Sequence, residues 1–101
     1  MTVYNKLVRD KIPEILDEKG VVHTTHIAED REYWIKLKEK LSEEVAEFQK
    51  DETRDELADI LEVIDAIKKY KNYSSEDILE IKNAKLQDRG GFEKRIILDE
   101  S

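Results

Sequence analysis

The stretch that decides the fold is residues 30–71, which read DREYWIKLKEKLSEEVAEFQKDETRDELADILEVIDAIKKYK. Its first half places apolar residues three and four positions apart, which is the pattern of an amphipathic helix. These residues are Trp34, Leu37, Leu41, Val45 and Phe48. We expect a helix capped by Asp30 that runs to about residue 50.

The second half of the stretch repeats this pattern after a break at residues 51–53. Its apolar positions are Leu57, Ile60, Leu61, Ile64 and Ile67. They predict a second helix that ends near residue 71. Because the link between the two helices is short, the pair is expected to be antiparallel.

The flanking segments predict two further helices and a small β element. Residues 10–19 are expected to form a short helix that has Pro13 in its first turn and ends at Gly20. A fourth helix is capped by Ser74 or Ser75 and ends at residues 90–91. Residues 21–27 and 96–98 are rich in β-branched residues, so they are expected to pair as a two-stranded patch beside the helices.

Length and composition set the fold class. The chain has 101 residues, enough for a single domain over residues 1–101, and only three Gly and one Pro, which favours a mainly α fold. Two facing helices in so short a chain leave one side of their apolar stripe uncovered. We therefore expect a homodimer in which antiparallel helices form a core like a four-helix bundle.

The charge balance excludes several classes of function. Eighteen Lys and Arg against 25 Asp and Glu give a net charge of −7, with no basic block to bind a nucleic acid polymer. No apolar run approaches the roughly 18 residues of a membrane span, so a soluble cytoplasmic protein is expected. The absence of Cys rules out thiol chemistry and thiolate zinc sites, which leaves carboxylates, Lys, Arg and hydroxyls for any reaction.

Four carboxylates fall on the inward side of the two long helices. At about 100° per residue, Glu44 borders the apolar stripe and Glu47 lies within one turn of it. Glu56 projects into the arc that must face the core, and Asp59 lies at its edge. Because buried acids need cations or protons, the four predict a cage for a hard divalent metal such as Mg²⁺. Pairing with lysines, as of Lys40 with Glu44, is the alternative that the periodicity leaves open.

Three ordered motifs resemble those of a known superfamily. EEVAE at residues 43–47, followed by ELAD at residues 56–59, resembles the EExxE and ExxD motifs of the MazG-like all-α nucleoside triphosphate pyrophosphohydrolases. The pattern of Asn83, Lys85 and Arg89 resembles the basic motif that follows these acids. The opening YNKLVRDKIP and the closing RGGF look like a small branch of that superfamily, similar to phosphoribosyl-ATP pyrophosphohydrolase.

The resemblance implies roles for individual residues. The metal ligands would be Glu44, Glu47, Glu56 and Asp59, holding Mg²⁺ or Mn²⁺. Lys85 and Arg89 would neutralise phosphate oxygens, and Asn83 would bind sugar, base or phosphate. A homodimer or a tetramer is the assembly that the superfamily implies.

Two further groups of basic residues are candidates for substrate binding. Lys6, Arg9 and Lys11 form a cluster in the N-terminal segment, where they would serve either as a phosphate-gripping arm or as solubilising charge. Lys40 matches a basic position before the acidic motif, and an intrahelical partner for Glu44 explains it equally well.

The reaction that the resemblance implies is Mg²⁺-dependent hydrolysis of a nucleoside triphosphate to a monophosphate and pyrophosphate, and the cell role that it implies is cleansing of the nucleotide pool. One ion would neutralise the triphosphate and another would lower the pKa of a water. The catalytic carboxylates would be Glu43, Glu44 and Glu47, with Glu43 or Glu47 as proton acceptor. The alternatives are another pyrophosphate-containing metabolite, such as a phosphoribosyl nucleotide, and a non-catalytic helical module that binds nucleotide or protein.

Overall fold

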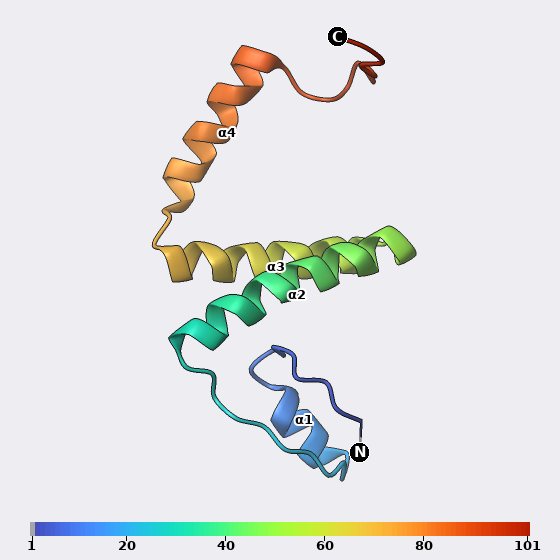
Figure 1. Cartoon of the computed structure of the whole chain (residues 1–101), viewed down its shortest axis with the longest axis vertical. Helices are drawn as coiled ribbons and strands as arrows, with labels where there is room; N and C mark the ends of the chain where they lie inside the picture. The colour runs from blue at the N-terminus through green and yellow to red at the C-terminus, as the bar shows by residue number, and fades with distance from the viewer. Residues whose placement is uncertain (1) are drawn as a thin grey trace.

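The computed structural model describes residues 2–101, and the chain forms four α-helices within them (Figure 1). They are α1 (Ile12–Glu18), α2 (Asp30–Asp51), α3 (Arg54–Lys71) and α4 (Ser75–Arg89). The prediction of a mainly α chain is confirmed, and each of the four predicted helices is present. None of these helices combines the length and the apolar character needed to cross a membrane.

Helices α2 and α3 pack against each other as an antiparallel pair (Figure 1). The most deeply buried apolar side chains are Leu37 of α2, which is 1% exposed, and Val63 of α3. Thr53 caps α3, because its hydroxyl accepts a hydrogen bond from the backbone N–H of Glu56 at 3.3 Å. The predicted cap at Asp30 is wrong: Glu29 occupies the N-cap position and Asp30 is the first helical residue.

Aromatic residues join the start of α2 to the end of α3. Tyr70 stacks on Trp34, with ring centroids 4.9 Å apart and planes 2° apart, and its hydroxyl donates a hydrogen bond to Asp30 at 2.9 Å. Tyr33 lies 5.6 Å from the Tyr70 ring in a tilted orientation. The carboxylate of Asp30 is therefore engaged across the helix pair, which explains why it does not cap its own helix.

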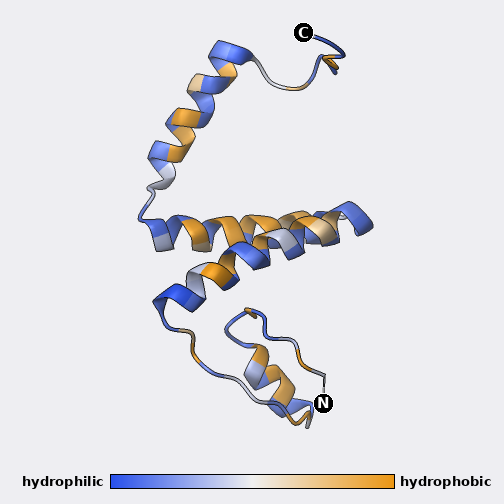
Figure 2. Ribbon diagram, viewed as in Figure 1, coloured by the Kyte–Doolittle hydropathy of each residue, from blue (hydrophilic) through white to orange (hydrophobic). Residues whose placement is uncertain are grey.

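Helix α4 projects away from the α2·α3 pair (Figure 1). Helix α3 ends at Asn72 in the left-handed conformation, with φ of 58°, and Ser74 caps α4 by accepting a hydrogen bond from the N–H of Asp77. Hydrophobic residues occur along α3, α4 and the C-terminal segment (Figure 2), and many of their side chains are exposed. They include Leu57, Leu61, Ile78, Leu79, Ile81, Leu86, Phe92, Ile96, Ile97 and Leu98.

The chain is far more extended than a compact domain of its size. Its radius of gyration is 17.9 Å, whereas a compact domain of this length has about 13 Å. Its accessible surface is 9483 Å², against roughly 5,900 Å² for a compact monomer of its mass. The single chain therefore exposes a surplus of surface, much of it apolar.

The predicted two-stranded patch does not form within residues 2–101, which contain no β-strand. Residues 21–27 lie beside α1, at the end of the molecule opposite to residues 96–98 (Figure 1). The loop is held to its flanking helices by side chains instead. His23 contacts Asp17 of α1 at 2.6 Å, and His26 contacts Glu32 of α2 at 2.9 Å.

Candidate functional site

Five carboxylates converge where α2 ends and α3 begins. Oxygens of Glu44, Glu56 and Asp59 lie within 4.8 Å of one another, and those of Glu47, Asp51 and Glu56 form a second such group. Because Glu56 belongs to both groups, the five residues form one continuous acidic cluster. It contains all four of the predicted metal ligands.

The local sequence explains this convergence. Glu44 and Glu47 are three residues apart on α2, and so are Glu56 and Asp59 on α3, so each pair shares one helix face. The Thr53 cap places Glu56 in the first turn of α3, where the helix dipole favours a negative charge. The short connection then sets the first turns of α3 beside the last turns of α2.

Sequence reasoning missed Asp51 as a member of the acidic cluster. Asp51 is the last residue of α2 and lies four positions after Glu47, which is the spacing of neighbours on one helix face. The signal was present in the sequence, but residues 51–53 were assigned to the break between the helices. The cluster therefore extends to the end of α2.

The acidic cluster carries excess negative charge, and one of its members, Glu44, is buried. Glu44 is 9% exposed, and its carboxylate pairs with Nζ of Lys40 at 3.2 Å, one turn earlier on α2. Partial burial raises the pKa of Glu56, and the charges of Asp59, Glu47, Glu44 and Asp51 raise it further. A cation beside Glu56 would relieve this repulsion.

Glu43 lies at the edge of the cluster and is occupied by two lysines. Its carboxylate accepts hydrogen bonds from Lys6 at 2.9 Å and from Lys40 at 3.3 Å. Partial burial raises the pKa of Glu43, but the hydrogen bond from Lys6 and the charge of Lys40 together outweigh it, and the pKa lies below its ordinary value. A low pKa makes Glu43 a poor proton acceptor. Within residues 2–101, Glu47 makes no ion pair, so it is the better candidate.

The N-terminal arm, residues 2–11, brings two of its three predicted basic residues to the acidic site. Lys6 contacts Glu43 of α2, and Nη2 of Arg9 lies 2.8 Å from Oδ1 of Asp59 on α3. Lys11 is exposed at the N-cap position of α1 and makes no ion pair within the described part of the chain. The arm therefore touches both helices that carry the acids.

The predicted basic motif of α4 does not reach the acidic cluster within one chain. Asn83, Lys85 and Arg89 are exposed on α4, which follows the far end of α3 (Figure 1). Residues 56 and 71 of α3 are separated by roughly 20 Å along the helix axis. The i, i+4 spacing of Lys85 and Arg89 was readable from the sequence, whereas the direction of α4 was not.

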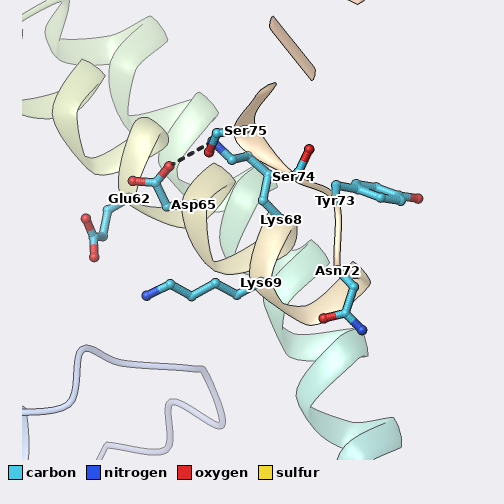
Figure 3. A pocket seen from close by; sticks show the side chains of 8 residues that line it. All are labelled: Glu62, Asp65, Lys68, Lys69, Asn72, Tyr73, Ser74 and Ser75. Carbon is cyan, nitrogen blue, oxygen red and sulfur yellow. Dashed lines mark ion pairs between the residues drawn. The ribbon is translucent and has the colours of Figure 1, made fainter. Parts of the chain in front are cut away.

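A surface crevice of about 620 Å³ lies at the junction of α3 and α4, at this same far end (Figure 3). Its lining combines acids with lysines, and Lys68 is paired with Asp65 at 3.5 Å. Figure 3 shows Tyr73 directed away from Lys69, so the side chains do not converge on a common point. The crevice lacks the excess of one charge that a phosphate or a metal ion requires.

Comparisons with known proteins cover half of the chain. An uncharacterized protein of Mycolicibacterium smegmatis is 46% identical over 50 residues, which are 50% of this chain and 51% of that protein. The chain thus spans about half the length of the curated relative that it matches. No family model and no solved structure matches the chain. The resemblance to MazG-like proteins therefore rests on the sequence motifs.

Proposed function

We propose that this chain is a Mg²⁺-dependent pyrophosphohydrolase that cleaves a nucleoside triphosphate between the α and β phosphates. The observation that carries the proposal is the convergence of Glu44, Glu56 and Asp59 within 4.8 Å from two antiparallel helices. Acids that serve only to solvate a surface point outward, whereas Glu44 is buried. The proposed cell role is removal of noncanonical or excess nucleotides from the cytoplasmic pool.

The donor set fits a hard divalent cation. All five members of the acidic cluster offer carboxylate oxygens, which Mg²⁺ prefers, and Mg²⁺ commonly shares its coordination between protein carboxylates and substrate phosphates. Glu44, Glu56 and Asp59 would hold one ion, and the second group, which includes Glu47, supplies donors for another. Mn²⁺ accepts the same donors.

The chain's own residues divide the remaining work. A bound divalent cation would supply charge neutralisation for the phosphates and activation of water. Water oxygen bonds to the α phosphorus while the bond from that phosphorus to the bridging oxygen breaks, and pyrophosphate leaves. Glu47 accepts the proton that the attacking water loses. Lys6 and Arg9, which contact Glu43 and Asp59 at the site, would bind phosphate oxygens.

A second copy of the chain would cover the exposed apolar surface. Two chains together carry a surplus of roughly 7,000 Å² over two compact monomers, which is more than the about 2,000–5,000 Å² that an obligate homodimer interface buries in total. We propose a homodimer in which α3 and α4 complete a helical bundle, with a tetramer as the larger alternative. In such an assembly α4 of the partner can carry Lys85 and Arg89 toward the acidic cluster.

The ion pairs within the chain favour one rival, a non-catalytic helical module. Lys40 and Arg9 already neutralise part of the cluster, at Glu44 and at Asp59 respectively. In that case the acids need no metal, and the chain would bind nucleotide or protein without turnover. Mg²⁺ binding and turnover discriminate between the two functions.

The test is a chromatographic product assay with a panel of canonical and modified nucleoside triphosphates and a phosphoribosyl nucleotide. The full chain is incubated with Mg²⁺ or with chelator, beside Glu56→Gln and the matched control Glu62→Gln, which removes the same charge from an exposed position of α3. We expect monophosphate and pyrophosphate from the wild type and from Glu62→Gln, and none in chelator or from Glu56→Gln. Turnover confined to the phosphoribosyl nucleotide would reassign the substrate.

Absence of turnover with every substrate, together with absence of Mg²⁺ binding, would contradict the proposal and favour the non-catalytic module. Undiminished turnover by Glu56→Gln would place the reaction at another site. Circular dichroism of the two variants verifies that each is folded. This control separates a lost activity from a lost structure.

A further inference from the structure

The N-terminal arm joins the two helices that carry the acidic cluster. Lys6 contacts Glu43 on α2, and Arg9 contacts Asp59 on α3. The two cations are only three residues apart in the sequence, while their partners are sixteen apart and belong to different helices. Residues 6–9 of the arm therefore lie across the site as a short strap, with a cation at each end of these four residues.

The charge at the site is only partly balanced by the chain. Six carboxylates gather there, those of Glu43 and of the five members of the acidic cluster. Within residues 2–101 three cations contact them, namely Lys6, Arg9 and Lys40, which leaves a net charge of −3 among these groups. Additional positive charge is thus favoured, and it would compete with the cations already present.

The three cations differ in how firmly they are held. The side chains of Lys40 and Glu44 are 16% and 12% exposed, so their pair is largely shielded from water. Those of Arg9 and Asp59 are 57% and 39% exposed, and those of Lys6 and Glu43 are 42% and 30% exposed. Solvent-exposed ion pairs are weak and easily exchanged. Lys40 is therefore a fixed part of the site, whereas the cations of the arm are replaceable.

We propose that the N-terminal arm is an exchangeable strap: in the chain alone Arg9 pairs with Asp59 of the acidic cluster and Lys6 with the neighbouring Glu43, and both move to the phosphates of the substrate once a divalent cation and the substrate bind. This inference rests on the metal site of the proposed function. A divalent cation held by Asp59 competes with Arg9 for the same carboxylate, and its positive charge repels the guanidinium. The polyphosphate that arrives with the cation offers the displaced Arg9, and Lys6 beside it, new anionic partners.

The proposal predicts a reciprocal coupling between metal and arm. Without nucleotide, the arm opposes metal binding and the metal loosens the arm. With nucleotide bound, the arm closes again over the phosphates. Lys11 belongs to the same arm but makes no ion pair within residues 2–101, so it takes no part in this exchange.

Calorimetric titration of Mg²⁺ into the full chain tests the coupling. Arg9→Gln removes a positive charge that contacts the cluster, and Lys11→Gln removes the same charge from the same arm without touching an acid. We expect Mg²⁺ to bind Arg9→Gln roughly threefold more tightly than Lys11→Gln, as the loss of one exposed ion pair allows. Equal affinities, or weaker binding by Arg9→Gln, would show that Arg9 does not compete with the metal and would overturn the strap.

Backbone NMR relaxation of residues 4–9 gives a second measure, independent of affinity. We expect these residues to become more mobile when Mg²⁺ is added, and less mobile when an α,β-methylene nucleoside triphosphate follows. An arm that keeps its mobility at both steps would contradict the exchange. Absence of Mg²⁺ binding by the wild type, or full binding by Glu56→Gln, would overturn the proposed metal site and the strap with it, whereas failure of the Arg9 comparison alone overturns only the strap.

Discussion

Replacing Leu61 with alanine tests whether a second copy covers the exposed face of α3. Leu61 is 57% exposed in the single chain, and it follows Leu57 by one helical turn on the same uncovered stripe. Leu37, which is 1% exposed between α2 and α3, provides the matched Leu→Ala comparison. The two variants remove the same atoms from an exposed and from a buried position.

The two states of assembly predict different costs for the Leu61 variant. Full burial of a leucine side chain contributes about 1.5–3 kcal/mol, so a side chain that is less than half buried loses about 1 kcal/mol on truncation to alanine. If a partner buries Leu61, its truncation leaves a cavity and costs about 2–5 kcal/mol. The Leu37 variant is expected to cost about 2–5 kcal/mol in either state.

Denaturant unfolding followed by circular dichroism, at several protein concentrations, measures both costs. The homodimer predicts that Leu61→Ala approaches the cost of Leu37→Ala, and that the wild-type midpoint falls on dilution. Sedimentation at micromolar concentration would then show a dimer. A Leu61 cost near 1 kcal/mol, with a midpoint independent of concentration and a monomeric profile, would refute the bundle.

Two further predictions concern the ionised groups of the α2·α3 pair. Lys40→Met leaves the buried Glu44 carboxylate unpaired, so it should lower the free energy of unfolding by about 1–3 kcal/mol in chelator. Saturating Mg²⁺ should recover part of that loss in a thermal melt. Equal losses in chelator and in Mg²⁺ would show that no cation binds beside Glu44. The hydrogen bond to Asp30 raises the pKa of the Tyr70 phenol above its ordinary 10.0, so the neutral form is favoured in the folded chain. The stability of the wild type over Tyr70→Phe should therefore be present below pH 10 and be lost as the pH rises through the raised pKa, and a difference in unfolding that stays constant across this range would contradict the assignment.

The helices could be predicted because their signals are local. The apolar spacing of α2 and α3 follows from helix geometry, and Thr53 and Ser74 are caps that act on their own first turns. The cap at Asp30 could not be assigned, because its carboxylate is taken by Tyr70, forty residues away. A contact of that range leaves no mark in the local pattern.

The acidic cluster could be predicted because Glu44 and Glu56 break the amphipathic pattern, which is a signal within single helices. The direction of α4 could not, because it depends on the turn at Asn72 and on the surfaces available to the helix. The prediction of a two-stranded patch was wrong for a related reason. β-propensity indicates an extended segment but does not indicate which strand it pairs with. Residues 21–27 instead contact α1 and α2 through His23 and His26.

The basic residues of the N-terminal arm were expected either to grip phosphate or to serve as solubilising charge, and the structure places Lys6 and Arg9 on carboxylates. The contacts arise because clustered acids attract the cations that lie within reach. The sequence showed the basic residues but not the loop that returns them to α2 and α3. The contact joins residues up to fifty positions apart, which no periodicity encodes.

A crystal structure of the chain with Mn²⁺ would decide whether the acidic cluster binds a divalent cation. An anomalous difference map locates the ion without assuming its ligands. We expect a peak between α2 and α3, at about 2.0–2.6 Å from carboxylate oxygens of Glu44, Glu56 and Asp59. A map without a peak at the cluster, with Arg9 still paired to Asp59, would contradict the metal site.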